Sequence, residues 1–247
     1  MAAVLAVCAV PREGEPLRRR LGAAWQPWHG WLRAHGRVHD QPVVLLAGGM
    51  GKANAAQAVT AIALTEPVAG VLGFGIGGAY ARAQLPLGAV ALASEELYAD
   101  EGVITPRGWR PLTTIGIPLL ERDGAPWFNA FPLDPAWVHW ARRVLGLPPA
   151  AVGRFLTVST CSGRASQGDF LATRFAALVE TMEGAAWAHA AARFDLPFVE
   201  VRGISNRVDD RNLAAWRFDE AAHAAADAAA RLLAAWITAP ETYRWTP

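Results

Sequence analysis

Two polar side chains in the segment Val179–Asp210 have the spacing to meet at one small molecule. Glu183 opens an alanine-rich stretch that predicts a helix, which must end before Pro197 because proline cannot continue a helix. Phe198–Ile204 then reads as a buried strand, with Asn206 just past its end. Ligand sites gather at the carboxyl ends of strands in open α/β sheets, so these two side chains can converge. An equally simple interpretation is that Glu183 favours the positive helix terminus and Asn206 only serves a turn.

A glycine-rich run after another apolar stretch offers a second place for a ligand. Gly73, Gly75 and Gly78 match the pattern G-x-G-x-x-G, which binds dinucleotides when it opens a helix. Pro86 and Gly88 interrupt the chain within about two turns, so the required helix is not expected. We therefore expect a loop in which glycines let a ligand approach the bare backbone.

Strands alternate with helices along most of the chain. The predicted strands at Val4–Val10, Val68–Phe74 and Val152–Ser159 are short and apolar, as buried parallel strands are. The predicted helices include Lys52–Thr65 and a long alanine-rich helix at Leu213–Trp236. This alternation predicts an α/β fold with a central mixed, largely parallel sheet flanked by helices.

The composition is that of a globular protein without a strongly charged surface. The 247 residues are 53% hydrophobic and 18% charged, with a formal net charge of +1. These values predict a single domain over residues 1–247 and give no argument for a nucleic-acid or membrane partner. The apolar N-terminus lacks the basic leader of a signal peptide, so we expect a cytoplasmic protein. Cys8 and Cys161 make neither a disulfide framework nor a zinc site.

Five short motifs, taken together, resemble the nucleoside phosphorylase and nucleosidase superfamily. Their order and spacing are most similar to its methylthioadenosine/S-adenosylhomocysteine nucleosidase branch, and the resemblance implies a three-layer fold around the mixed sheet. The motifs are Ala9–Glu13, Gly49–Lys52, Gly75–Gly78, Met182–Gly184 and Val201–Asn206.

The long segment Tyr98–Phe131 is rich in proline and glycine and carries motifs that resemble the futalosine hydrolase family. These motifs are Ala99–Pro106, Ile117–Leu119 and Asn129–Asp134. Long loops in compact domains are usually functional or mobile, so we expect this segment to influence substrate selectivity.

The resemblance implies roles for three residues. Glu13 matches the residue that orients and deprotonates the attacking water, although a solvated glutamate after a strand would look the same in the sequence. Glu183 matches the glutamate that accepts hydrogen bonds from ribose hydroxyls, and Met182 the methionine that packs against the ribose. Breaking a purine N-glycosidic bond builds positive charge on the ribose, so such acceptors favour the transition state. The substrate-binding residues it further implies are Gly75, Ile76, Gly77, Ser162 and Gly163.

Asn206 departs from the adenine-releasing branch, which carries an aspartate at this position. An amide offers one donor group and one acceptor, but it cannot release a proton near neutrality. A donor suits the O6 and N7 edge of a 6-oxopurine, and futalosine carries hypoxanthine, so residue and family agree. How the departing base is protonated stays open, and water can supply that proton.

The nucleophile separates a hydrolase from a phosphorylase. Phosphorylases of this superfamily bind phosphate with arginines beside the glycine loop; Leu72–Gly77 contains none, although Arg12 and Arg82 are near in sequence. The resemblance therefore implies hydrolysis of futalosine to hypoxanthine and dehypoxanthinyl futalosine in menaquinone biosynthesis, without a metal or organic cofactor. A purine nucleoside phosphorylase, a methylthioadenosine/S-adenosylhomocysteine-type nucleosidase and a non-catalytic nucleoside-binding module stay open as alternatives.

The resemblance leaves the subunit partner and the base-stacking residue to be found. The family usually assembles as homo-oligomers whose partner subunit closes the 5′ pocket, so we expect a dimer or larger assembly. It also has an aromatic residue that stacks on the base, where this chain has Ser162–Arg164. Phe155 and Phe170 are the candidate substitutes.

Overall fold

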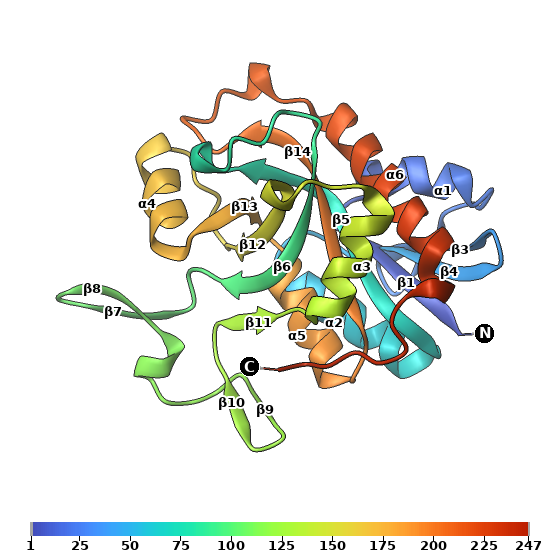
Figure 1. Cartoon of the computed structure of the whole chain (residues 1–247), viewed down its shortest axis with the longest axis horizontal. Helices are drawn as coiled ribbons and strands as arrows, with labels where there is room; N and C mark the ends of the chain where they lie inside the picture. The colour runs from blue at the N-terminus through green and yellow to red at the C-terminus, as the bar shows by residue number, and fades with distance from the viewer. Residues whose placement is uncertain (1, 247) are drawn as a thin grey trace.

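The computed structural model describes residues 2–246 and has a central mixed sheet with helices on both faces (Figure 1). The strands run in the order β11-β6-β12-β13-β5-β1-β4-β3-β2, and β14 pairs with both β5 and β6. The bounds are β1 (Ala3–Cys8), β2 (Gln26–Trp28), β3 (Trp31–Val38), β4 (Gln41–Ala47), β5 (Val68–Ala79), β6 (Val90–Tyr98), β11 (Ala130–Pro132), β12 (Val152–Thr157), β13 (Ala177–Thr181) and β14 (Phe198–Arg207).

The double pairing of β14 closes part of the sheet into a ring of strands, β5-β14-β6-β12-β13. The parallel pairings are those of β1 with β4 and β5, of β12 with β6 and β13, and of β14 with β5. Among the described residues, the other pairings in this sheet are antiparallel. The predicted mixed α/β architecture is therefore confirmed.

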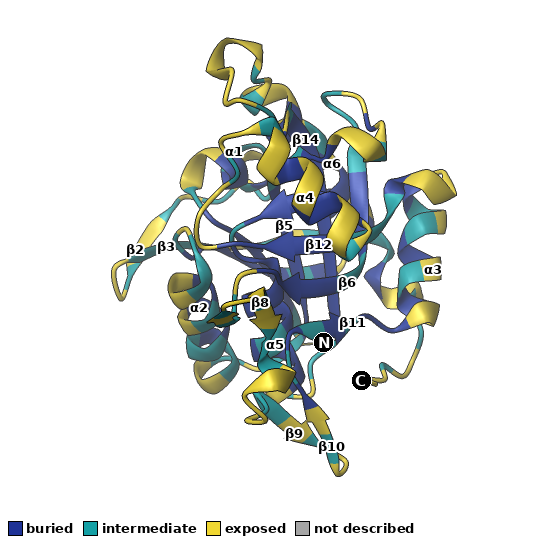
Figure 2. Ribbon diagram, turned by 90° about the vertical axis from the view of Figure 1, so that its left-hand side faces the viewer, coloured by how far each residue is buried: buried dark blue, intermediate teal, exposed yellow. Residues whose placement is uncertain are grey.

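Six α-helices within residues 2–246 cover the sheet. They are α1 (Pro11–Arg20), α2 (Lys52–Thr65), α3 (Pro135–Leu145), α4 (Ala165–Phe175), α5 (Gly184–Arg193) and α6 (Phe218–Ala235). Short 3₁₀ turns lie at η1 (Ala81–Ala83), η2 (Leu112–Thr114), η3 (Pro149–Ala151), η4 (Leu213–Ala215) and η5 (Trp236–Thr238). Helices α2 and α5 share one apolar core with the sheet, and α1, α3 and α6 share another. Figure 2 shows the buried strands between helices whose outer faces are exposed.

Alanine lets α5 and α6 lie close to the sheet. Every alanine of α5 is buried, and α6 buries most of its alanines from Ala221 to Ala230. Small side chains lose little conformational freedom in a helix and allow close approach between backbones. The polar ends of neighbouring strands are therefore held near the start of α5, where the candidate site lies.

The glycine run was wrongly predicted as a loop, because it continues β5 to Ala79. A Cβ atom at Gly73 would lie 2.8 Å from the Trp187 ring, and one at Gly77 would lie 2.6 Å from Val179. These glycines thus let side chains pack directly onto the strand, and they do not form a turn.

The long C-terminal helix begins later than predicted. Residues 208–217 form a loop containing η4, and α6 starts only at Phe218. The backbone N–H of Arg217 donates to the Ser205 carbonyl at 2.8 Å, which holds the end of this loop against β14. The loop therefore stands over the end of β14, beside Asn206.

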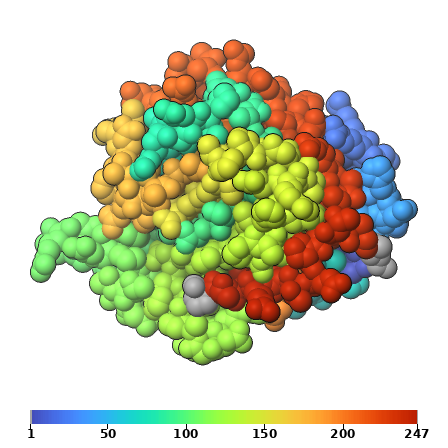
Figure 3. Space-filling model, in the orientation of Figure 1, coloured from blue at the N-terminus to red at the C-terminus, as the bar shows by residue number. Residues whose placement is uncertain are grey.

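The segment between β6 and β11 forms two small hairpins (Figure 1), and the space-filling view shows part of this segment projecting from the molecule (Figure 3). They are β7 (Gly102–Thr105) with β8 (Gly108–Pro111), and β9 (Leu120–Arg122) with β10 (Ala125–Trp127). Ile104 and Ile117 are 85% and 70% exposed on this segment, which we call the projecting arm (residues 99–129). Within residues 2–246, no helix is long and apolar enough to cross a membrane.

Candidate active site

A cavity of about 300 Å³ lies where β5, β13 and β14 meet the starts of α1 and α5. It collects most of the residues singled out from the sequence, namely Glu13, Ile76, Gly77, Ser162, Met182, Glu183 and Asn206. Gly75 and Gly163 are not part of its lining. The convergence predicted at the strand ends therefore occurs.

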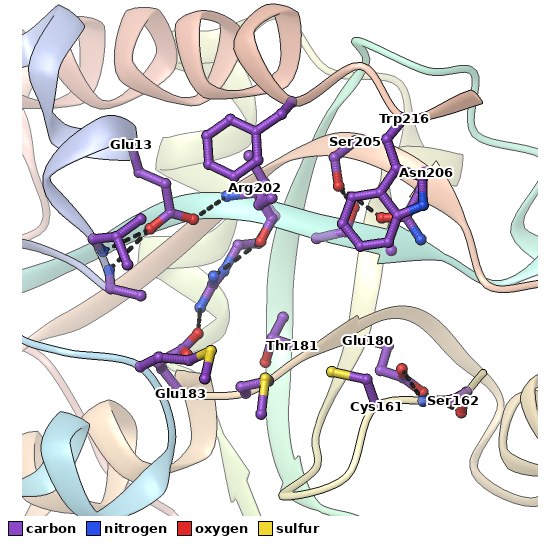
Figure 4. A pocket seen from close by; sticks show the side chains of 18 of the residues that line it. Glu13, Cys161, Ser162, Glu180, Thr181, Glu183, Arg202, Ser205, Asn206 and Trp216 are labelled. Atoms are coloured by element: carbon purple, nitrogen blue, oxygen red, sulfur yellow. Dashed lines mark hydrogen bonds and ion pairs between the residues drawn. The ribbon is translucent and has the colours of Figure 1, made fainter. Parts of the chain in front are cut away.

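The cavity has two polar ends of different character (Figure 4). Glu13, Glu183 and Arg202 form one end, which we call the acidic end. Asn206 and Trp216 lie at the other, which we call the amide end.

Glu13 lies in the first turn of α1, not in a loop after β1 as its sequence position suggested. One carboxylate oxygen accepts the backbone N–H groups of Ala9 and Val10 at 3.0 and 3.1 Å. The other accepts the N–H of Ile76 on β5 at 2.9 Å. Only 3% of Glu13 is exposed, and this burial raises the pKa of its carboxyl group. The side chain is thus held rigidly between a helix start and a strand.

Glu183 is the residue immediately before α5, as predicted, and it is also 3% exposed. One of its oxygens accepts the N–H of Gly51 at 3.0 Å, and the other accepts a guanidinium N–H of Arg202 at 3.2 Å. Each carboxylate oxygen can accept more than one hydrogen bond, so capacity remains for a ligand hydroxyl. Met182 lines the cavity beside it.

Arg202 is a functional candidate that the sequence reasoning passed over. It is 1% exposed on β14, and its guanidinium donates to Glu200 at 2.7 Å, to the Ile76 carbonyl at 3.0 Å and to Glu183. Burial lowers the pKa of Arg202, but the surrounding carboxylates raise it by more, so the side chain stays charged. The sequence did contain a sign of this role, because an arginine inside an apolar strand needs an oppositely charged partner that is also buried.

Gly75 contributes to the acidic end indirectly. A Cβ atom there would lie 2.6 Å from the Glu13 carboxylate and 3.2 Å from the Arg202 guanidinium. The absent side chain leaves the space in which these two groups approach each other. Ile76 and Gly77, the next residues of β5, line the cavity directly.

Asn206 lies within the last residues of β14, slightly earlier than the predicted position beyond the strand. Its side-chain oxygen accepts from the Ser205 hydroxyl at 2.7 Å, and its NH₂ group donates to the Arg207 carbonyl at 2.9 Å. An amide NH₂ carries two donors, so one proton is left for a ligand.

The polar groups of Ser162 face the protein as well as the cavity. Its N–H and hydroxyl donate to the two oxygens of Glu180, at 2.8 and 2.6 Å. Tyr80 also donates to Glu180, at 3.0 Å. Glu180 lines the cavity and was not recognised from the sequence, because its neighbours Ser162 and Tyr80 are remote along the chain. Gly163 does not line this cavity, and it lies instead on a separate hollow that is also lined by Ser162.

The aromatic residues of the cavity come from the loop before α6 and from the first residue of that helix. Trp216 and Phe218 line the cavity, whereas neither aromatic candidate taken from the sequence does. Phe155 is fully buried in the core, and Phe170 is 54% exposed on α4. The sequence reasoning assigned the region of Trp216 to a helix, which hid this aromatic residue.

Comparison with known proteins agrees with the fold. A family model described as the phosphorylase superfamily matches residues 3–238. The futalosine hydrolase of Thermus thermophilus is 40% identical over 222 residues, covering 90% of this chain and 89% of that protein. The futalosine hydrolase of Streptomyces coelicolor is 37% identical over 210 residues, covering 82% and 81%.

Solved structures share the architecture. The 5′-methylthioadenosine/S-adenosylhomocysteine nucleosidase of Neisseria meningitidis, in complex with methylthio-immucillin-A, has a TM-score of 0.80 at 22% identity. The alignment covers 95% of this chain and 100% of that one. A futalosine hydrolase mutant of Helicobacter pylori has a TM-score of 0.77 at 18% identity, covering 94% and 99%.

These relatives are N-glycosyl hydrolases by name, so the enzyme class predicted from the motifs is confirmed. The match extends over most of both chains and includes every strand of the ring. The chain therefore belongs to the phosphorylase superfamily and, within it, to the futalosine hydrolase family.

Proposed function

We propose that this protein hydrolyses the N-glycosidic bond of futalosine, releasing hypoxanthine and dehypoxanthinyl futalosine, as a step of menaquinone biosynthesis. The observation that carries the proposal is one cavity with two buried carboxylates at one end and a neutral amide at the other. The first suits a ribose that becomes cationic, and the second suits a 6-oxopurine base. The similarity to futalosine hydrolases supports this choice of substrate.

The acidic end serves the sugar in this mechanism. Glu13 accepts a proton from water, whose oxygen bonds to the anomeric carbon as the bond to the base nitrogen breaks. Glu183 accepts hydrogen bonds from ribose hydroxyls, and these bonds strengthen as the ring gains positive charge. Arg202 donates to Glu183, and its positive charge opposes the rise that burial causes in the pKa of Glu13. Met182, Ile76 and Gly77 shape the wall around the sugar.

The amide end serves the base. The free amide proton of Asn206 donates to O6 or N7 of hypoxanthine, while the Ser205 hydroxyl holds the amide oxygen. Trp216 offers a face on which the purine stacks. Ser162 contributes through its carbonyl group, since its N–H and hydroxyl already donate to Glu180. Water completes protonation of the departing base, because asparagine cannot.

Electrostatics favours water over phosphate as the nucleophile. Arg202 and Arg211 are the two arginines that line the cavity among residues 2–246. The guanidinium of Arg202, at the acidic end, already donates to Glu200, Glu183 and the Ile76 carbonyl. A phosphate dianion placed there would meet the carboxylates of Glu13 and Glu183. This arrangement argues against the purine nucleoside phosphorylase alternative.

The decisive experiment mixes the purified protein with futalosine, inosine and methylthioadenosine, each with and without phosphate. We expect futalosine to be cleaved in phosphate-free buffer, giving the free sugar product and hypoxanthine. Strict dependence on phosphate would support a phosphorylase, and preference for methylthioadenosine would support the nucleosidase alternative. Binding of all three without turnover would leave a nucleoside-binding module.

We also propose that the protein is a cytoplasmic homo-oligomer, a dimer or larger, built of one domain and acting without metal or organic cofactor. Ile104, Ile115 and Ile117 on the projecting arm are exposed apolar side chains of the kind that subunit interfaces cover. Light scattering after size exclusion measures the assembly, and a monomer at micromolar concentration would contradict it.

A further inference from the structure

Two fully buried glutamates lie next to the acidic end, and neither lines the cavity. Glu96 on β6 and Glu200 on β14 are both 0% exposed. A Cβ atom at Gly184 would lie 2.3 Å from an oxygen of Glu96 and 2.7 Å from an oxygen of Glu200. The missing side chain at the start of α5 therefore leaves one small space, which both carboxyl groups share.

This space is short of hydrogen-bond donors. One oxygen of Glu200 accepts the Nε–H of Arg202 at 2.7 Å. The second oxygen of Glu200 and both oxygens of Glu96 have no donor among residues 2–246. Buried polar atoms are nearly always hydrogen-bonded, and two neighbouring ionised carboxylates would also repel each other.

A single shared proton removes both problems. A carboxylic acid on Glu96 becomes a donor to the unpartnered oxygen of Glu200, and one negative charge disappears. Burial and the neighbouring Glu200 raise the pKa of Glu96 well above its ordinary value. Burial raises the pKa of Glu200 as well, but Arg202 opposes that rise, which assigns the proton to Glu96.

We propose that protonated Glu96 donates to ionised Glu200, and that this pair positions Arg202 at the floor of the active site. The inference rests on the proposed function for the role of Arg202, and it adds two positioning residues to that site. Arginine is never deprotonated in proteins, so the pair is no proton relay to the departing base.

The pair of Glu96 and Glu200 fixes the position of the Arg202 guanidinium and the net charge around it. Glu200 holds the Nε side of the guanidinium, which leaves the other nitrogens directed at Glu183 and the Ile76 carbonyl. Ionisation of Glu96 would add a further negative charge beside Glu200 and disturb this ion pair. A small displacement of a positioning group can lower turnover about 100-fold.

Two isosteric substitutions separate the roles of the two carboxyl groups. Glu96→Gln replaces one neutral donor by another, so kcat on futalosine should stay within about threefold of the parent. Glu200→Gln removes the anion that holds Arg202, so kcat should fall about 10- to 100-fold, with KM changed less than about threefold. Glu95→Gln, on the same strand but paired with Arg154 away from the cavity, is the matched control and should leave both constants unchanged.

Glu96→Leu provides the comparison at the same position if Glu200→Gln does not fold. It removes the donor at similar volume, so kcat should fall as in Glu200→Gln while Glu96→Gln remains active. Equal loss in Glu96→Gln and Glu96→Leu, or a harmful Glu96→Gln beside a harmless Glu200→Gln, would overturn the assignment of the proton.

Infrared spectroscopy tests the proton without any substrate. The parent at neutral pH should show the C=O stretch of a buried carboxylic acid, which a carboxylate lacks. The band should vanish in Glu96→Gln and persist in Glu95→Gln. Absence of the band in the parent, or its survival in Glu96→Gln, would refute the pair. A parent that shows the band but leaves futalosine intact would refute the proposed function alone.

Discussion

The two ends of the cavity are built in different ways. At the acidic end, Glu13, Glu183 and Arg202 are each at most 3% exposed and are held by backbone N–H groups or by one another. At the amide end, Asn206 and Trp216 are partly exposed, and Trp216 lies on a loop. The acidic end is therefore rigid and costly to alter, whereas the amide end can change with little effect on the rest of the fold.

This difference suggests a division of labour. Burying charged groups lowers the stability of a protein unless the charges are paired. Two buried carboxylates are therefore useful mainly where they stabilise a cationic transition state. Residues at a strand end or on a loop can be substituted without disturbing the core. Such residues are therefore well placed to select which purine base is bound. The following predictions test whether catalysis and base selection separate in this way.

Loss of the Glu13 carboxylate should have the largest effect. Glu13→Gln keeps the size of the side chain but cannot accept a proton from water, so kcat should fall by roughly two to four orders of magnitude. KM should change much less, because the amide end still binds the base. Steady-state kinetics with futalosine provides both constants.

Glu15→Gln is the matched control for that experiment. Glu15 lies on the same helix and pairs with Arg18 on the surface, outside the cavity. Its activity should equal that of the parent. Near-normal turnover in Glu13→Gln would remove Glu13 from the mechanism.

Changing Asn206 should alter the choice of base more than the rate. An ionised aspartate would place an acceptor against the O6 and N7 acceptors of hypoxanthine, an unpaired arrangement in a buried site. Adenine presents an amine donor at position 6, which aspartate can satisfy. Asn206→Asp should therefore shift the ratio of kcat/KM for futalosine over 6-amino-6-deoxyfutalosine by about 100-fold or more toward the amine.

The exposed Asn212, which does not line the cavity, offers a control through Asn212→Asp. Its ratio should match the parent. An unchanged ratio in Asn206→Asp would mean that base selection lies elsewhere, with the loop at Ser162 as the next place to examine.

Removal of the Trp216 ring should weaken binding at the amide end. Stacking of a base on an aromatic ring contributes about 1–3 kcal/mol, so Trp216→Ala should raise KM roughly 5- to 150-fold, with a smaller change in kcat. Phe170→Ala, which removes an aromatic ring outside the cavity, should leave KM unchanged. Equal effects of the two substitutions would show that Trp216 does not stack on the base.

The pH dependence should report the acidic end alone. Glu13 must be ionised to act as a base, and burial raises its pKa above the ordinary 4.5. The value of kcat/KM should therefore fall about tenfold per unit as the pH drops below this raised pKa. The amide of Asn206 does not titrate, so it should add no further slope to the pH profile of kcat/KM. A profile that stays flat down to pH 4.5 would contradict an elevated pKa at Glu13.

Local patterns in the sequence predicted a good part of this molecule. The helix over Lys52–Thr65 has the predicted bounds, because its alanine-rich run is flanked by clear breaks. Asp134 caps α3 by accepting the backbone N–H groups of Ala136 and Trp137, the usual role of an aspartate before a proline at a helix start. Glu183 and Asn206 could be paired from sequence because a helix start and a strand end adjoin in α/β folds.

Other features depend on contacts between segments far apart in the chain. Arg202 is an active-site candidate only because Glu183 and Glu200 surround it, and Glu180 reaches the cavity only through Ser162 and Tyr80. The glycine run became a strand because a distant tryptophan and valine pack onto it. No local pattern records such partners, since charge pairing and close packing are decided by which strands lie side by side, and tertiary structure alone determines that.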